Sequence, residues 1–312
     1  MAPRIAVIIP CFNEELTVKK VVSDFKRELP TSAIYVFDNC SSDNTAKFAA
    51  EAGATVIPAP IPGKGATVRQ AFGSVEADIY VMVDGDDTYP AEQVHEMISK
   101  VTQGFDMVCG DRLSNGRYKG ENQRPFHTFG NACIVSMISW VLRRKINDVL
   151  TGYRAMSRRF VKNCPLLLDK FEVETEMTIH AVEKKFRMIE IPIEYRDRPK
   201  GSYSKLNTMT DGMLVMRAII WLVKDCKPLW FFGSLGIIGI VVATLGIFQA
   251  DSSLVPLFWM LFIIASAILG CGLVLDTVTK QNLQTFAISM IHQGDTGSPP
   301  ESGPGVGVGD GK

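Results

Sequence analysis

The sequence lacks an excess of either charge, a paired-cysteine motif and an N-terminal hydrophobic leader. Its 312 residues contain 33 Lys and Arg and 33 Asp and Glu, which excludes the basic excess of a general nucleic-acid binder. Seven cysteines are scattered without a CxxC pair, and an odd number cannot close into a complete disulfide framework. Residues 1–4 lead directly into an apolar run, so we expect no signal peptide and reduced thiols facing the cytoplasm.

Charge is nearly absent from one part of the chain, and large apolar residues are scarce in another. Residues 229–275 contain one charged side chain, Asp251, whereas the final 19 residues are mostly Gly, Pro and small polar types. Residues up to about 228 have the mixed composition of a soluble α/β protein. We therefore expect a globular part, an apolar part and a disordered tail at 293–312.

The most informative stretch is 79–90, in which an apolar run ends in an acidic turn. Asp84, Asp86 and Asp87 follow a buried-type strand at 79–83, with Gly85 between the first two carboxylates. Open α/β sheets bind ligands at this end of their strands. Clustered carboxylates repel one another and are best tolerated around a hard cation such as Mg²⁺ or Mn²⁺. The alternative is an acidic turn that caps a helix starting near Pro90.

Strands alternate with helices in the first half of the chain, which is typical of a parallel sheet with right-handed crossovers. Polar turns follow each strand, so we expect these turns to share one edge of the sheet. The expected strands lie at 5–9, 33–37, 55–57, 79–83, 107–109 and 188–193, with helices at 13–29, 45–52, 66–75 and 130–142 between them.

Two of these turns have polar side chains whose role the sequence leaves open. Lys64 lies between two glycines in the loop 62–65, where it either contacts a phosphate or is an ordinary exposed turn lysine. The loop does not fit the Walker pattern. Asp38 and Asp43 follow the second strand, where they either cap the next helix or contact a nucleoside.

A basic loop precedes the apolar part of the chain. Residues 195–205 carry four positive charges and one negative charge, and residues 206–228 have the pattern of an amphipathic helix lying at a membrane interface. Such a loop is either simply solvated or placed to meet anionic headgroups or a lipid phosphate.

Two apolar runs, at 229–248 and 255–275, are each long enough to cross about 30 Å of hydrocarbon as a helix. The link between them is short, so they form a hairpin whose flanks lie on the same side of the bilayer. Lys224, Lys227 and Lys280 flank the pair and place that side, with both termini, in the cytoplasm. A second interfacial helix is expected at 277–292.

These observations combine into one functional hypothesis. A sheet edge with phosphate-directed turns and a metal-type acidic turn suits a nucleotide-activated donor, and the basic loop beside a hairpin suits an acceptor presented by the bilayer. The sequence therefore predicts group transfer between a soluble donor and a lipid.

The motifs themselves resemble those of the family 2 glycosyltransferases. The segment 10–14, PCFNE, is similar to their first-strand motif, 38–43 to their DDGSxD turn, and 84–86 to their D-x-D. Within that family, the segments 148–154, 171–174 and 198–206, with the hairpin, resemble the polyprenyl-phosphate hexosyltransferases, the group that includes dolichol-phosphate mannosyltransferase. The resemblance covers about 290 residues and implies a GT-A fold, a Rossmann-like, mostly parallel α/β domain over 1–205 followed by the transmembrane hairpin 229–276.

The resemblance implies roles by position. The resemblance, together with the separate argument for Lys64 from its loop, predicts the nucleotide-sugar contacts. They are Pro10, Phe12, Glu14, Asp38, Asn39, Lys64, Asp84, Gly85 and Asp86. Metal binding is expected at Asp84, Asp86 and Thr88. Lipid-phosphate contacts are expected at Arg112, Arg124, His127, Arg198 and Lys205, and catalysis at Asp86, Arg112, Arg198 and Lys205.

The chain departs from the mannosyltransferases at three places. Thr88 stands where they have Gln, and Thr128 stands where they have Arg, with His127 and Arg124 nearby as replacements. The loop around Lys64 is closer to other members of the wider family.

The implied chemistry is inverting transfer of a hexose-type sugar from a UDP- or GDP-sugar to undecaprenyl or dolichyl phosphate. A phosphate monoester is already largely anionic at neutral pH, so no strong base is required. Glu174 is then expected to orient basic residues.

Four questions stay open at this stage. A hydroxyl acceptor would need a base such as Asp148 or Glu174. A processive synthase would share the donor half, but no Arg-Trp pair of its Q-x-x-R-W motif exists in the chain. An inactive nucleotide-sugar scaffold is the remaining alternative. Small residues along the first span permit packing within the hairpin or in a homo-oligomer.

Overall fold

The computed structural model describes residues 2–114, 145–199, 223–249 and 251–294, together with positions 139, 201, 213, 217 and 220. The chain divides into two compact units, Met1–Cys226 and Lys227–Lys312. The expected helices at 130–142 and 206–228 fall largely outside the described residues.

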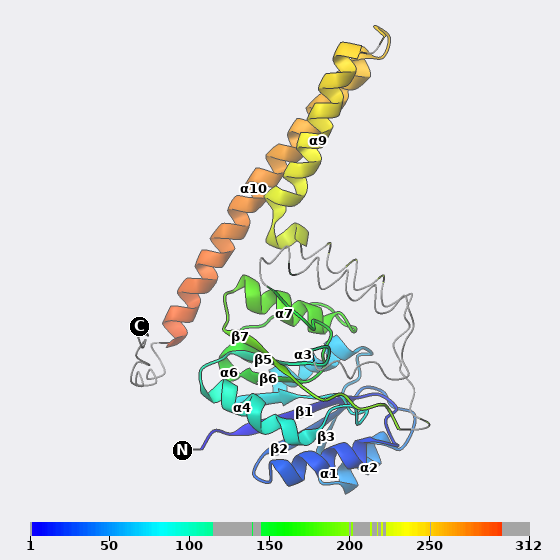
Figure 1. Ribbon diagram of the computed structural model, residues 1–312, viewed down its shortest axis with the longest axis vertical. Coiled ribbons are helices and arrows are strands. Elements are labelled where there is room, and N and C mark those ends of the chain that lie inside the picture. Colours follow the sequence, from blue (N-terminus) through cyan, green and yellow to red (C-terminus); the bar gives the residue numbers. More distant parts are fainter. Residues whose placement is uncertain are drawn as a thin grey trace, which may run out of the picture. The chain divides into compact units, whose positions relative to one another are not determined.

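The first unit is built on a seven-stranded sheet with strand order β3-β2-β1-β4-β6-β5-β7 (Figure 1). Its strands are β1 (Ile5–Cys11), β2 (Ala33–Asp38), β3 (Thr55–Pro58), β4 (Ile79–Met82), β5 (Met107–Asp111), β6 (Arg154–Ser157) and β7 (Met188–Pro192). Only β6 runs antiparallel to its neighbours β4 and β5. The expected mostly parallel α/β sheet is confirmed.

The sequence analysis did not anticipate β6. The strand has only four residues and begins with a charged side chain, and it lies between β4 and β5 although residues 112–153 separate it from β5 in the sequence. Non-local pairing of this kind leaves no periodic signal in so short a segment.

Helices occupy the crossovers between strands. They are α1 (Val18–Glu28), α2 (Thr45–Glu51), α3 (Lys64–Ser74), the short 3₁₀ turn η1 (Ala91–Gln93), α4 (Val94–Thr102), α6 (Arg158–Lys162) and α7 (Val173–Glu183). The first helix starts at Val18 rather than at Asn13, because Asn13 adopts a left-handed backbone conformation with φ of 52°. Residues 13–17 are thereby left as a polar turn above the end of β1.

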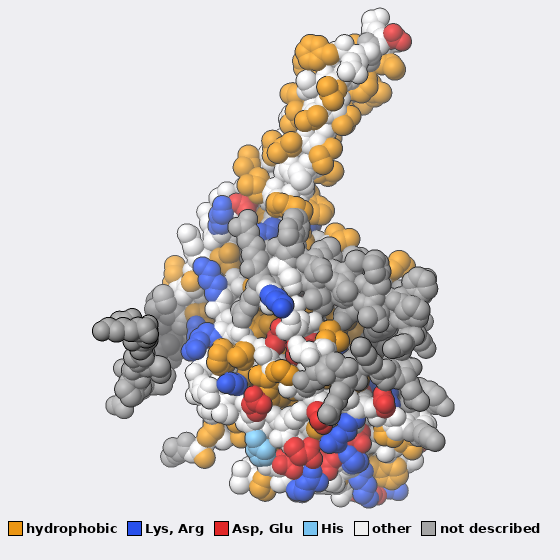
Figure 2. Space-filling view, viewed as in Figure 1, with side chains coloured by type: hydrophobic (Ala, Val, Ile, Leu, Met, Phe, Trp, Pro, Cys, Tyr) orange, Lys and Arg blue, Asp and Glu red, His pale blue; other side chains and the backbone are white. Residues whose placement is uncertain are grey.

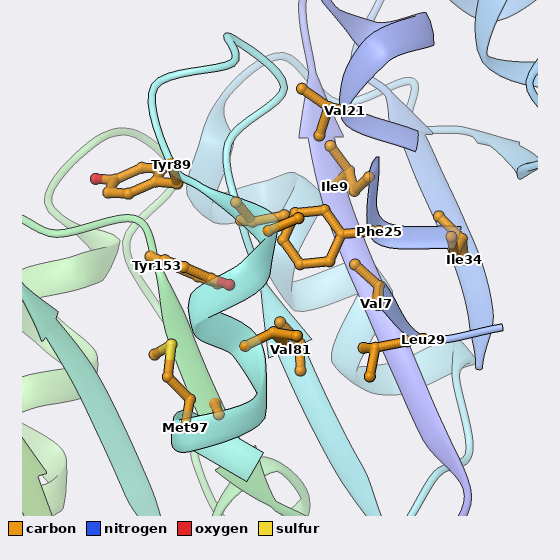
Figure 3. Packing of buried hydrophobic residues seen from close by; sticks show 14 of the residues in the cluster. Val7, Ile9, Val21, Phe25, Leu29, Ile34, Val81, Tyr89, Met97 and Tyr153 are labelled. Atoms are coloured by element: carbon orange, nitrogen blue, oxygen red, sulfur yellow. The ribbon is translucent and has the colours of Figure 1, made fainter. Parts of the chain in front are cut away.

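The hydrophobic core lies between β1, β4 and the helices on one face of the sheet. Helix α1 buries Val18, Val21, Val22 and Phe25, the spacing of one helical face. Figure 3 shows Phe25 among the side chains of β1 and β4, near Tyr153, whose ring it meets edge-on at 6.0 Å. This packing fixes the strand ends from which the polar turns project.

The second unit is a pair of long apolar helices, α9 (Pro228–Gln249) and α10 (Val255–Gly294). Both are long and apolar enough to cross a membrane, and Figure 2 shows hydrophobic side chains along their surfaces. Residues 277–292 are helical as expected but continue α10 without a break. No Pro or Gly interrupts the chain between 273 and 293, and Lys280 pairs with Asp276 one turn away.

The small residues of α9 are used within this helical pair. A Cβ at Gly236 would meet the backbone of Ala265, and one at Gly246 would run into the ring of Phe258 on α10. The two helices approach closely along this stripe, as small residues permit. Of the two alternatives for the stripe, the structure shows packing within the hairpin.

Candidate active site

The turns after β1 and β2 form one connected surface at the carboxyl edge of the sheet. The Oδ1 atom of Asn13 accepts a hydrogen bond from the Ser42 N–H at 2.8 Å, and Ser41 Oγ accepts one from the Asn13 N–H at 2.9 Å. The Glu14 N–H donates to Thr45 Oγ1 at 2.7 Å. These reciprocal bonds between backbone and side chains fix the two turns relative to one another.

The structure distinguishes between the two acidic residues of the second turn. Asp43 Oδ1 accepts from the Thr45 N–H and hydroxyl at 3.0 and 2.5 Å, so this side chain, one residue before the N-cap Asn44, binds the first N–H of α2. Asp38 lies at the end of β2, and its Oδ1 atom is buried without a hydrogen-bond partner among the described residues. A buried acceptor in this state costs free energy until a donor reaches it.

Asn39 connects the second turn to the loop that precedes Lys64. Its Nδ2 donates to the carbonyls of Ala59 and Ile61 at 2.9 and 2.7 Å, and its Oδ1 accepts from the Gly63 N–H at 2.7 Å. All of its hydrogen-bonding groups are engaged with the backbone. Asn39 therefore shapes the loop that carries Lys64.

The other expected nucleotide-side residues lie on the same edge. Pro10 is near the end of β1, and Phe12 directly after it is 44% exposed. Glu14 is buried. The Thr17 hydroxyl donates to the Gly85 carbonyl at 2.6 Å, so the first turn is also tied to the acidic turn.

The three carboxylates of the acidic turn have different cationic partners. Asp84 Oδ1 lies 2.5 Å from Lys64 Nζ, and Asp86 Oδ2 lies 2.5 Å from an Arg198 guanidinium nitrogen. Asp87 adopts a left-handed backbone with φ of 60° and pairs with Lys20 Nζ at 2.6 Å. Asp84 and Asp86 thus face residues that the sequence assigned to the site, whereas Asp87 faces α1.

Asp86 is almost completely buried, and burial raises its pKa above the ordinary value. Neighbouring Asp84 raises the pKa further, against the opposite effects of Arg198 and Thr88. The Thr88 hydroxyl donates to Asp86 Oδ1 at 2.6 Å. In the structure Thr88 holds this carboxylate in place, and its direct contact with a metal stays a prediction.

Lys64 bridges two carboxylates. Its Nζ lies 2.6 Å from Glu174 Oε1 in addition to Asp84. Burial alone would lower the pKa of Lys64, but Asp84 and Glu174 outweigh that effect and raise it, so the ammonium stays charged. Burial raises the pKa of Glu174 despite its contact with Lys64. The expectation that Glu174 orients a basic residue matches this contact.

The glycines on either side of Lys64 are required by the protein's own backbone. A Cβ at Gly63 or Gly65 would collide with the carbonyl oxygens of Asp169 and Leu168, and Gly63 has φ of 127°. The Ala66 N–H also donates to the Asp169 carbonyl at 3.1 Å. The sequence left the loop open between phosphate contact and an ordinary exposed turn, and the structure uses its two glycines to pack α3 against residues 168–169.

A second glycine contact limits the position of Asp84. A Cβ at Gly152 would overlap the Asp84 carboxylate, and the Gly152 N–H donates to the Tyr89 hydroxyl at 3.0 Å. The loop before β6 therefore lies directly against the acidic turn.

Arg154, at the start of β6, is fully buried and secures that loop. Its guanidinium donates to the carbonyls of Val149 and Thr151 at 2.8 and 3.0 Å. It also donates to the Glu174 carbonyl at 3.0 Å and the Thr178 hydroxyl at 2.9 Å. One side chain thus fixes both the Gly152 loop and the first turn of α7, which carries Glu174.

Arg112, expected to bind phosphate, is paired with Asp148. Its Nε and one terminal nitrogen lie 2.6 and 2.8 Å from the two oxygens of this buried carboxylate. The guanidinium carbon also lies 5.4 Å from the centre of the Tyr195 ring. The contacts that the structure shows for Arg112 are those of a residue held by the protein itself.

Three of the expected acceptor residues, Arg124, His127 and Lys205, lie outside the described residues. Arg198 is described and contacts the acidic turn, with 24% of its side chain exposed. Of the expected basic residues, the structure therefore brings Lys64 and Arg198 to the acidic turn.

The acidic turn can supply two oxygen ligands to a hard divalent cation. Among the described residues, no group of three or more His, Cys, Asp or Glu side chains comes together at a metal-binding distance. A pair of carboxylates completed by waters and substrate phosphates is how Mg²⁺ is usually held. The residues present thus fit a metal that arrives with its substrate.

Comparison with known proteins identifies the family. The profile of Glycosyl transferase family 2 matches residues 6–164, about half of the chain and the whole region from β1 to α6. The chain belongs to the family 2 glycosyltransferases. The resemblance seen in the sequence motifs is thereby confirmed.

This glycosyltransferase has relatives in Haloferax volcanii. It is 33% identical over 233 residues to "Glycosyltransferase AglJ", covering 74% of this chain and 76% of that protein. It is 27% identical over 216 residues to "Dolichyl-phosphate hexose transferase", covering 69% of this chain and 92% of that protein.

Solved structures show the same GT-A fold. Glucosyl-3-phosphoglycerate synthase from Mycobacterium tuberculosis, in complex with Mn²⁺, UDP and phosphoglyceric acid, matches with a TM-score of 0.57 and 19% identity. The match covers 72% of this chain and 78% of that one. The expected fold of the globular part is confirmed.

The sequence analysis gave no role to Thr17, Gly152 or Arg154. The last two fall in the segment 148–154, which the resemblance marked without assigning its members. Thr17 looks like an ordinary residue at a helix start, and only its bond to Gly85 across the sheet edge shows its part in the site.

Proposed function

We propose that the protein transfers a hexose-type sugar, with inversion, from a UDP- or GDP-sugar to a membrane polyprenyl phosphate. The observation that carries the proposal is the pairing of Asp84 and Asp86 with Lys64 and Arg198 at the carboxyl edge of the sheet. Two carboxylates and two cations in one place provide ligands for a divalent metal and partners for a diphosphate. The name of the dolichyl-phosphate relative and the two apolar helices support a lipid-linked acceptor.

The nucleoside would bind over the turns after β1 and β2. Asp38 Oδ1 is a buried acceptor without a partner among the described residues, and both uracil and guanine carry a ring N–H that could donate to it. Pro10, the exposed Phe12 and Glu14 border the same edge. This arrangement supports a uridine or guanosine nucleotide.

Asp84 and Asp86 would hold Mg²⁺ or Mn²⁺, with Thr88 fixing the second carboxylate. The solved synthase that shares the fold was crystallised with Mn²⁺ and UDP. A bound divalent ion supplies positive charge that stabilises the departing nucleoside diphosphate. Lys64 and Arg198 are close enough to the acidic turn to contribute to the same task.

The acceptor would be a phosphate monoester, whose oxygen attacks the anomeric carbon as the bond to the diphosphate breaks. Its second pKa is near 6, so the attacking oxygen needs no general base. Asp148 and Glu174, the candidate bases for a hydroxyl acceptor, are engaged with Arg112 and Lys64. This favours the phosphate over the hydroxyl. Arg198, Lys205, Arg112, Arg124 and His127 are the proposed acceptor contacts.

The hairpin of α9 and α10 would span the bilayer, with the catalytic domain and both termini in the cytoplasm. Lys224 and Lys227 before the hairpin and Lys280 after it support that orientation. The acceptor lipid and the active site would then meet at the cytoplasmic surface.

A radiolabel transfer assay tests the proposal. Full-length protein in detergent is incubated with Mn²⁺ or Mg²⁺, a panel of UDP- and GDP-sugars, and undecaprenyl or dolichyl phosphate, and label in the organic phase is counted. We expect metal-dependent label that Asp86→Asn abolishes and Asp87→Asn preserves. Release of nucleoside diphosphate only when a hydroxyl acceptor replaces the lipid phosphate would contradict the acceptor assignment. Donor binding without any turnover would favour a scaffold.

A further inference from the structure

The two ion pairs of the acidic turn carry a further inference, which rests on the proposed function. We infer that Lys64 and Arg198 are internal counter-ions of Asp84 and Asp86, and that both cations change partner when metal and donor bind, from the carboxylates to the donor diphosphate. Lys64 and Arg198 are then positioning residues that make binding of the metal and of the diphosphate mutually dependent.

Each cation forms a close ion pair with its carboxylate. Lys64 Nζ and the Arg198 guanidinium each approach within 2.5 Å of a carboxylate oxygen, Asp84 Oδ1 and Asp86 Oδ2 respectively. A divalent ion that binds these oxygens meets a positive charge already at the site. At such distances like charges repel strongly, so metal binding is opposed while the cations stay in place.

Lys64 has a second carboxylate to hold it when it leaves Asp84. Glu174 Oε1 lies 2.6 Å from Nζ, and its side chain is only 5% exposed. A lysine ammonium on a flexible four-carbon stem can stay in contact with Glu174 while its remaining N–H groups turn to a phosphate. Glu174 itself is fixed by the bond from Arg154 to its backbone carbonyl.

Charge balance explains why the exchange needs both ligands. Asp84, Asp86 and Glu174 face two cations, and a divalent ion alone would add two positive charges to a largely buried site. A diphosphate that arrives with the metal offers anionic oxygens to Lys64 and Arg198, so neither is left buried and unpaired. The metal and the diphosphate should therefore bind cooperatively, and the coupling must be reciprocal.

Mn²⁺ binding measured by electron paramagnetic resonance tests the inference without turnover. Free Mn²⁺ is titrated against full-length protein in detergent, with and without UDP, and UDP affinity is measured by calorimetry. Lys64→Met removes the counter-ion of Asp84. The double variant Lys64→Met/Glu174→Gln removes it without changing the net charge of the protein. Lys26→Met, at an exposed lysine in the last turn of α1, is the control for loss of one positive charge.

We expect both variants at Lys64 to bind Mn²⁺ alone about five- to tenfold more tightly than the wild type, a typical size for coupling between sites. Affinity for UDP in the presence of Mn²⁺ should fall by about tenfold, because a cation that contacts the diphosphate is gone. The factor by which UDP tightens Mn²⁺ binding should shrink accordingly. Lys26→Met should match the wild type.

The double variant decides between the inference and a general charge effect. The inference is overturned if Lys64→Met/Glu174→Gln binds Mn²⁺ alone no more tightly than the wild type while its thermal unfolding shows an intact fold. If Lys64→Met binds Mn²⁺ more tightly but the charge-balanced double variant does not, the effect comes from net charge and the inference is overturned. If the Lys64 variants do not fold, Arg198→Gln tests the same inference at the pair whose cation is the more exposed of the two.

The outcome is separable from that of the proposed function. If Mn²⁺ binding responds as expected but no sugar reaches a lipid phosphate, the acceptor assignment fails and the counter-ion inference stands. If the wild type binds no Mn²⁺ even with UDP, the metal role and the inference fail together.

Discussion

The turns after β1 and β2 are joined by hydrogen bonds between backbone and side chains, whereas the carboxylates of the turn after β4 pair with cations. In the first region, the side chains of Asn13, Asn39 and Thr45 bond to backbone groups, and none of these three side chains carries a charge. In the second region, Asp84 and Asp86 each have a cation as a partner. This difference supports the proposal of a preformed nucleoside surface beside a phosphate site whose internal partners are replaced by ligands.

Isosteric substitutions of Asp84 or Asp86 should lower the rate of sugar transfer more than any other change considered. Asp84→Asn or Asp86→Asn removes a charge needed for metal and diphosphate, and we expect sugar transfer to fall by about a thousandfold. Asp87→Asn is the matched control, because Asn tolerates the left-handed backbone and Asp87 faces Lys20. The measurement is label transferred to lipid at saturating donor. Equal losses for all three variants would contradict the division of roles within the turn.

Adding a methyl group at Gly152 should also lower sugar transfer, because it displaces a carboxylate of the acidic turn. Gly152→Ala places a Cβ against the Asp84 carboxylate and displaces it, and a misplacement of this kind can cost about a hundredfold in kcat. Gly73→Ala is the control, since a Cβ at this position in the last turn of α3 meets no atom within 4 Å. That control should gain up to about 1 kcal/mol of stability with activity unchanged. Wild-type transfer by Gly152→Ala would show that Asp84 tolerates movement.

A substitution in the turns after β1 and β2 should change stability more than it changes metal binding. Asn39→Asp keeps the shape of the side chain but removes the N–H donors to the carbonyls of Ala59 and Ile61. We expect a loss of about 2 kcal/mol in the free energy of unfolding, measured with urea. Asn163→Asp, which loses one surface bond to Arg159, should cost less. A larger change in Mn²⁺ affinity than in stability for Asn39→Asp would contradict the comparison.

A histidine outside both regions gives the smallest expected effect and a pH reference. Burial lowers the pKa of His180, which packs on Phe160 and Phe186, below its ordinary value of 6.5. As pH falls below 6.5, the unfolded chain takes up a proton that the folded protein does not, so stability should fall with pH in this window. The contribution is at most about 1.4 kcal/mol per pH unit. His180→Gln should reduce the dependence of stability on pH below 6.5. An unchanged slope would show that other groups cause this dependence.

How much could be predicted differs between these parts of the chain. The parallel strands, the D-x-D turn and the two apolar helices follow from local periodicity and residue type, which act within a few residues. The antiparallel strand β6 and the bonds of Arg154 depend on segments far apart in sequence. The residue type alone does not show that Arg154 is buried. The packing role of Gly63 and Gly65 was not predicted, because their neighbour is the backbone at 168–169, about a hundred residues away.

The sequence by itself determined the alternation of strands and helices, the family, the position of the carboxylates at a strand end, and the positions of the two apolar runs. Backbone preference and hydrophobic pattern are local properties, so they can be read from the sequence directly. Only the tertiary structure decided which cation meets which carboxylate, that Asp87 turns to Lys20, and that Gly152 lies against Asp84. Charged side chains bind whatever partner the fold brings within about 4 Å, and that distance is set by packing across the whole sheet.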